Sequence, residues 1–254
     1  MNKIKFLGTA GARFVVTKQL RKSGGTWLKL DDTNVIIDPG PGSLVKCLSS
    51  KPKLSPLELD GIILTHRHID HSNDINVMIE AMTNGGFKKK GVVFAPKDTL
   101  EDDPVILKYV RSYIETIEIL KEKGTYSIKN ISFSTPIKHN HGVETYGLNI
   151  YSRNHSISMI TDTKYFEKLE SYYRGNILII NSVLIEEKDY IQHLSLKDVE
   201  KIISANNPKL TILTHFGMTF IKSKPWEIAE DLTKKLGVKV IAASDGMEID
   251  LDNL

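Results

Sequence analysis

The stretch of sequence that decides the fold reads Gly61-Ile62-Ile63-Leu64-Thr65-His66-Arg67-His68-Ile69-Asp70-His71. Its apolar first half contains β-branched residues and follows Asp60, which predicts a short strand covered on both faces. His66 and His68 come just after that strand and are two residues apart, so in extended backbone they point to the same side. Both can therefore reach one metal ion at the end of a buried strand.

Asp70 and His71 come next, ahead of a stretch at 72–83 in which apolar residues recur at helical spacing. Adjacent residues at the start of such a helix diverge, so this pair could serve a second ion near the first. Imidazole is the commonest protein ligand for zinc-like ions, and carboxylate oxygen completes the ligand set of many hydrolytic sites. A chance cluster of surface histidines is the alternative. A metal-dependent hydrolase is the first hypothesis.

Length and composition set limits on the rest. The 254 residues, 41% of them hydrophobic, are enough for one large domain or two small ones. No linker, low-complexity tract or charge block divides the chain, so we expect a single domain over 1–254. A net charge of +3 does not by itself indicate nucleic acid as a partner.

The cellular location is also an expectation from composition. Cys47 is the single cysteine and cannot form an internal disulfide, which favours a reducing compartment. Residues 1–8 lack the apolar core of a signal peptide, and no stretch approaches the ~18 apolar residues that a membrane span needs. We therefore expect a cytoplasmic protein without a membrane partner.

Strand-like and helical patterns alternate along the chain, which indicates an α/β layered architecture. The candidate strands lie at 3–8, 26–30, 34–38, 61–65, 91–95, 130–135, 145–151, 156–161, 176–180, 209–214 and 238–242. The candidate helices lie near 42–50, 72–83, 104–114, 164–171, 195–205 and 225–236. Ser195 and Pro225 are typical starting residues for the last two helices. The run Thr211-Ile212-Leu213-Thr214-His215 echoes the strand before His66, which suggests two sheets whose strand ends converge on one site.

If two ions bind, ligands must also come from elsewhere. His141, Asp162 and His215 each follow a candidate strand, where functional sites are commonly assembled. Asp162 could bridge the ions, because a carboxylate has two oxygens. The expected cofactors are two divalent metal ions, zinc first, with manganese or iron as alternatives. The open positions would hold a shared water, acidified to a hydroxide nucleophile.

The chain resembles the metallo-β-lactamase-fold hydrolases over nearly its whole length. The resemblance is carried by Leu7-Gly8-Thr9-Ala10-Gly11, Ile37-Asp38-Pro39-Gly40-Pro41-Gly42, the segment His66 to His71, His141 with Tyr146-Gly147, Thr161-Asp162-Thr163 and Leu213-Thr214-His215. It implies a four-layered αβ/βα sandwich, an α/β fold with two mixed sheets between outer helices.

The same resemblance implies how the candidate ligands divide. One ion would be held by His66, His68 and His141. The other would be held by Asp70, His71 and His215, with Asp162 bridging the two. Asp38 resembles the family's carboxylate that orients a ligand histidine from behind.

Differences between this chain and particular branches of the superfamily narrow the range of reactions that we expect. The bacterial lactamases commonly use cysteine near the position of Asp162, which this chain lacks. The segment Gln192-His193-Leu194-Ser195 resembles an element of ribonuclease Z in which a histidine protonates a leaving oxygen, a suitable task for a general acid. Asp70 and His193 are thus the candidate catalytic residues. The alternative makes His193 an ordinary hydrogen-bonded residue that leads into a helix.

Two features disfavour tRNA as the substrate. Asn181-Ser182-Val183 stands where ribonuclease Z has a glutamate-containing segment, and residues 84–130 show no long Gly/Pro-rich arm. We therefore expect a phosphodiesterase acting on a small-molecule or nucleotide phosphodiester. A carboxylic-ester, lactone or thioester hydrolase of the glyoxalase II type is one alternative, and a non-catalytic binding or sensing module is another. Residues 100–113 could form a lid or an interface of a homodimer, and His139 is expected to make a loop hydrogen bond.

Overall fold

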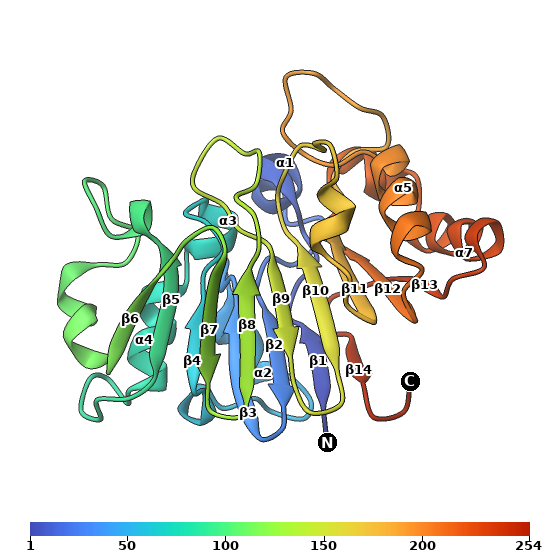
Figure 1. Cartoon of the computed structure of the whole chain (residues 1–254). Helices are drawn as coiled ribbons and strands as arrows, with labels where there is room; N and C mark the ends of the chain where they lie inside the picture. Colours follow the sequence, from blue (N-terminus) through green and yellow to red (C-terminus); the bar gives the residue numbers. More distant parts are fainter.

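Fourteen strands and seven α-helices make up the computed structural model, which describes residues 1–254 (Figure 1). The strands are β1 (Lys3–Phe6), β2 (Thr26–Leu30), β3 (Thr33–Ile37), β4 (Gly61–Ile63), β5 (Val92–Pro96), β6 (Thr116–Leu120), β7 (Gly124–Ile128), β8 (Ile131–Thr135), β9 (Leu148–Tyr151), β10 (Ser156–Ile160), β11 (Ile177–Asn181), β12 (Leu210–Thr214), β13 (Val240–Ala242) and β14 (Glu248–Asp250). The α-helices are α1 (Ala12–Thr17), α2 (Ser43–Ser49), α3 (Ile69–Ser72), α4 (Ile75–Met82), α5 (Leu196–Asn206), α6 (Met218–Lys222) and α7 (Pro225–Leu236).

The strands form two seven-stranded mixed sheets. The first has the order β14-β1-β2-β3-β4-β5-β6, and the second has the order β13-β12-β11-β10-β9-β8-β7. In each sheet one part is antiparallel and the other is parallel, with β3 to β6 parallel in the first and β10 to β13 parallel in the second. The predicted four-layered αβ/βα sandwich with two mixed sheets is confirmed.

Three apolar clusters explain why these layers pack. The largest, of 25 buried residues, draws side chains from the facing sides of both sheets. A second lies between the first sheet and α2 and α4, and a third lies between the second sheet and α5 and α7. The strands β4, β11 and β12 are buried along their whole length, as expected for strands covered on both faces.

Phe133 of β8 joins the two sheets at the centre of the largest cluster. Its fully buried ring lies 4.9 Å from that of Phe94 in the other sheet and stacks at 5.0 Å on Tyr126. We expect Phe133→Ala to lower the free energy of unfolding by about 3–5 kcal/mol, because it leaves a cavity among close-packed side chains. Urea denaturation would measure this, with Thr125→Ala on the exposed side of β7 expected to stay within about 0.5 kcal/mol of wild type.

The helix predicted at 104–114 is wrong. Only Lys108–Tyr113 turns, as the 3-10 helix η3. Its apolar residues Ile106, Val110 and Ile114 are buried at the spacing that suggested an α-helix. However, the Arg111 guanidinium donates to the carbonyls of Ile106 and Leu100. The Ile106 carbonyl is therefore bonded to a side chain, whereas in an α-helix it would accept a hydrogen bond from a backbone N–H.

The helix predicted at 72–83 is present as α4, Ile75–Met82, and a break separates it from the short α3 because the backbone N–H of Asp74 donates to the Pro39 carbonyl. The helix predicted at 164–171 needs correction. At 164–171, Lys164 pairs with Asn140 and Lys168 adopts a left-handed φ of 68°, so that only Leu169–Tyr172 turns, as the 3-10 helix η4. Neither break in helical structure is marked in the sequence by a glycine or a proline.

The start signals for the last two helices are confirmed. The Ser195 side chain accepts from the backbone of Asp198 in a capping box, and Pro225 occupies the first turn of α7. Along α7, Ala229 and Leu232 are buried, whereas Trp226 in the first turn is 58% exposed. The three-residue 3-10 helices η1 (Pro56–Glu58) and η2 (Lys97–Thr99) were not predicted from the sequence. None of the helices is both long and apolar enough to cross a membrane.

Candidate metal centre

The candidate side chains follow the ends of strands in both sheets. His66 follows β4 of the first sheet, whereas Asp162 and His215 follow β10 and β12 of the second. His66 Nε2 lies 3.8 Å from Asp162 Oδ2, and His215 Nδ1 lies 3.5 Å from Asp162 Oδ1. The echo between Thr65-His66 and Thr214-His215 thus corresponds to two strand ends that meet at one place.

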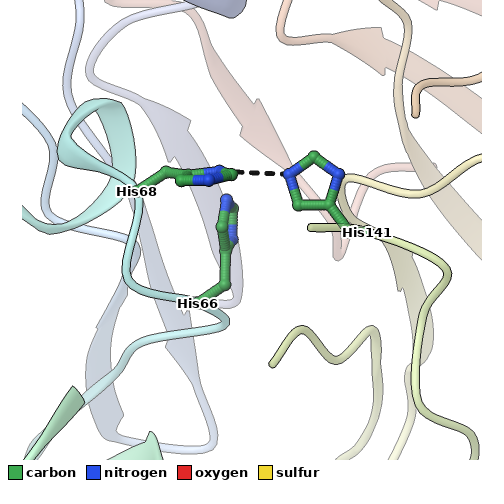
Figure 2. Close-up of side chains that lie close together, drawn as sticks. All are labelled: His66, His68 and His141. Atoms are coloured by element: carbon green, nitrogen blue, oxygen red, sulfur yellow. Dashed lines mark hydrogen bonds between the residues drawn. The ribbon is translucent and has the colours of Figure 1, made fainter. Parts of the chain in front are cut away.

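One group of possible ligands consists of His66, His68 and His141. One ligand atom from each lies within 4.8 Å of the others. Figure 2 shows a nitrogen of His68 pointing at a nitrogen of His141, with His141 Nε2 3.1 Å from His68 Nδ1, while the three rings of His66, His68 and His141 are nearly perpendicular to one another. The buried His66 Nε2 has no hydrogen-bond partner, so its lone pair is free for an ion.

A second group consists of Asp70, His71 and His215, again within 4.8 Å of one another. His215 Nε2 lies 2.9 Å from His71 Nε2 and 3.4 Å from Asp70 Oδ2. Two imidazole nitrogens and a carboxylate oxygen that converge in this way form a donor set suited to a divalent cation. Asp70 and His71 are neighbours in α3, yet both reach this group, as expected from their position at the start of a helix.

Asp162 lies between the two groups. Its Oδ2 is 3.4 Å from His71 Nε2 in one group and 3.9 Å from His141 Nε2 in the other. The side chain is 2% exposed, so it is held inside the protein rather than at the surface. A buried carboxylate in this position fits the bridging role that we expected for it.

Asp38 supports the histidines from behind. Its Oδ2 accepts a hydrogen bond from His71 Nδ1 at 2.9 Å, and its two oxygens accept from the backbone and hydroxyl of Thr65 at 2.7 Å each. The Thr65 hydroxyl oxygen lies 3.1 Å from His66 Nδ1. When both rings are neutral with the proton on Nδ1, the Nε2 lone pairs of both histidines face the centre, which is the usual arrangement around a metal.

The backbone is constrained at the same positions. Asp38 and His215 have left-handed φ values of 51° and 56°, which cost energy in residues that carry a Cβ and which cluster at functional sites. Gly11 packs so closely on His215 that a Cβ at Gly11 would collide with the His215 carbonyl and Nδ1. A Cβ at Gly40 would similarly collide with the carbonyl oxygen of Asp70. Both glycines belong to the motifs that carry the family resemblance.

The charge states also suit a metal. Burial lowers the pKa of His66 and His68, so both rings are neutral and able to bind an ion. Burial alone would raise the pKa of Asp162, but the surrounding imidazoles, His215 first, hold it well below its usual range. Around His71, Asp70 and the other carboxylates outweigh burial and raise its pKa, so this part of the pocket favours positive charge.

His193 lies beside the two groups. Its Nδ1 is 3.8 Å from Asp162 Oδ2, and its ring centre is 5.2 Å from that of His141. Burial, opposed by the charge of Asp162, lowers the pKa of His193 to about 4, so at neutral pH the ring is neutral and retains one N–H. The ring makes no hydrogen bond within the protein, which argues against the alternative of an ordinary structural residue leading into α5.

Some supporting contacts were not predicted. The backbone carbonyl of Gln192 lies 3.1 Å from His141 Nδ1, and Asn181 Nδ2 donates to Asp162 Oδ1 at 2.8 Å. Contacts with backbone carbonyls cannot be recognised from the residue types in a sequence. Asn181 could have been found, because it ends a buried strand as the candidate ligands do. The loop hydrogen bond expected for His139 is present, at 2.6 Å from the Tyr173 hydroxyl.

The chain is similar in sequence to two curated archaeal proteins. It is 27% identical to the uncharacterized protein MJ1374 of Methanocaldococcus jannaschii over 258 residues, covering 98% of this chain and 95% of that protein. It is 23% identical to a ribonuclease Z of Nanoarchaeum equitans over 243 residues, covering 70% of this chain and 77% of that protein.

Solved structures show the same fold. The metallo-β-lactamase fold protein YhfI from Bacillus subtilis matches with a TM-score of 0.78 at 17% identity, covering 98% of each chain. A diphosphatase from the PhnP family matches with a TM-score of 0.71 at 19% identity, covering 99% of this chain and 98% of that one. The family model of the beta-lactamase superfamily domain matches residues 33–216. This chain therefore belongs to the beta-lactamase superfamily and has the metallo-β-lactamase fold.

Proposed function

We propose that this protein is a dinuclear metal-dependent phosphodiesterase. The observation that carries the proposal is the pair of ligand groups that share one buried carboxylate, with the free imidazole of His193 beside them. His66, His68 and His141 would hold one ion, Asp70, His71 and His215 would hold the other, and Asp162 would contact both. Zinc suits this histidine-rich set, and manganese or iron would also fit.

Bound divalent ions supply Lewis acidity, which lowers the pKa of coordinated water and neutralises charge on phosphoryl oxygens. The residues of the chain would do the rest. Asp38 holds His71, and through Thr65 also His66, in the tautomer that presents Nε2 to the centre. Protonated His193 would donate a hydrogen bond, and with it the proton, to the leaving oxygen of the substrate; the negative charge of a bound phosphodiester favours this imidazolium form. Because these side chains follow the ends of buried strands, they are held in position before the substrate binds, as electrostatic catalysis requires.

A small phosphodiester is the substrate class that we favour. Two proteins similar to this chain are described as a diphosphatase and as a ribonuclease Z, which supports chemistry at phosphorus. Residues 84–130 form β5, β6 and β7 with 3-10 turns between them, and offer no long extension that could grip a tRNA. A nucleotide or another small diester would need no such arm.

A substrate panel on protein of measured metal content tests the proposal. It would compare bis-p-nitrophenyl phosphate, cyclic nucleotides, RNA 3′ ends, lactones and thioesters, each with and without added zinc or manganese. We expect kcat/KM for the small phosphodiesters to exceed that for the acyl substrates. A preference for lactones or thioesters would favour the glyoxalase II type of activity, and a fully metallated protein inert on every substrate would favour a binding or sensing role.

A further inference from the structure

Asn181 ends β11 between the two strands that lead to Asp162 and His215. β11 pairs in parallel with β10 on one side and with β12 on the other, and Asn181 is in register with Thr214. The side chain is 4% exposed and lines the same small cavity as Asp70, His71 and His215. The polar side chain of Asn181 therefore faces the candidate metal centre from the end of β11.

The amide of Asn181 makes one directed contact with the centre. Its Nδ2 donates to Asp162 Oδ1 at 2.8 Å. The other oxygen, Oδ2, lies 3.8 Å from His66 Nε2 and 3.4 Å from His71 Nε2, one from each candidate ligand group. Rotation of an aspartate about its last bond is soft, because that torsion has broad minima. His215 Nδ1 also lies near Oδ1, at 3.5 Å, but the shorter hydrogen bond from Asn181 is the contact that directs Oδ1 and with it the position of Oδ2.

We propose that Asn181 is a positioning residue that fixes the carboxylate of Asp162 between the two ions; this inference rests on the proposed function. Asn181 supplies a neutral donor, so it holds the carboxylate without competing with the ions for charge. An aspartate of the same size would place a second carboxylate against Oδ1 and repel it. A leucine would leave Oδ1 buried without its donor, which costs free energy and frees the carboxylate to turn.

The test compares zinc binding by wild type, Asn181→Leu and Asn181→Asp. Metal-free protein is titrated with Zn²⁺ in competition with a chromophoric chelator, and the melting temperature of the metal-free form is recorded for each variant. Loss of a contact behind a ligand commonly weakens metal affinity about 10- to 100-fold, and we expect both variants to show a loss in this range. Using two variants of nearly the native size separates the lost donor from lost packing.

Asn149→Leu is the matched control. Asn149 is also buried in the second sheet, where its Nδ2 donates to the Tyr172 carbonyl at 2.8 Å and its Oδ1 accepts from Ser158. We expect this variant to lose stability and to keep the zinc affinity of wild type. Wild-type affinity in either Asn181 variant would overturn the inference, while a wild-type protein that binds neither zinc, manganese nor iron would overturn the proposed function itself.

Discussion

Replacing Asp162 by alanine is expected to remove bound metal and to reduce turnover of a small phosphodiester at least about 10³-fold. Asp162 is the carboxylate that approaches histidines of both candidate groups, at 3.4 Å from His71 and 3.9 Å from His141. If Asp162 bridges two ions as proposed, its loss would leave each group with one ligand fewer. Metal ions stabilise transition-state charge by several kcal/mol, and each 1.36 kcal/mol corresponds to a tenfold change in rate.

Metal content and kcat/KM should be measured on the same preparations. Asp60→Ala is the matched control, since the Asp60 side chain is 8% exposed and bonds to Lys129 and to the backbone of Asn34, outside the centre. This control should lose stability and retain its metal. Full metal occupancy in Asp162→Ala would contradict the bridging assignment, and full activity would contradict the proposed site.

The parts of the fold that were predictable are those in which one local signal dominates. The apolar run before His66 can only be buried, and the capping residue Ser195 marks where α5 begins. The edge strand β6 was missed although polar and apolar residues alternate along Thr116-Ile117-Glu118-Ile119; only its last residue, Leu120, is buried. The false helix at 104–114 shows a side-chain contact overriding periodicity, since Arg111 donates to the carbonyl of Ile106, which the sequence pattern assigns to a helix.

In the candidate site, too, the predictable parts were those with a local signal in the sequence. Histidine and aspartate after strands were visible as residue types, and the structure brings all seven predicted side chains together. The contacts behind them depend on which strands are neighbours. Asn181 reaches Asp162 only because β10 and β11 are paired, although 19 positions separate the two residues in sequence. Such pairings cannot be read from a single sequence.

His193→Ala is expected to slow cleavage of a diester with an alkoxide leaving group by about 10²- to 10⁴-fold, the usual contribution of a general acid. Cleavage of bis-p-nitrophenyl phosphate should suffer much less, because nitrophenolate leaves without being protonated. Metal content should stay unchanged, since the proposed ligand groups are complete without His193. Steady-state kinetics on both substrates, with metal analysis of each preparation, would measure the difference.

The dependence on the leaving group separates the possible roles of His193. A proton donor matters in proportion to the basicity of the leaving oxygen, whereas a metal ligand or a structural residue would affect both substrates equally. His155→Ala is the control, because that histidine is also partly buried but contacts Asp252, away from the centre. Equal losses on the two substrates, or loss of metal from His193→Ala, would therefore exclude proton donation and make His193 part of the binding site.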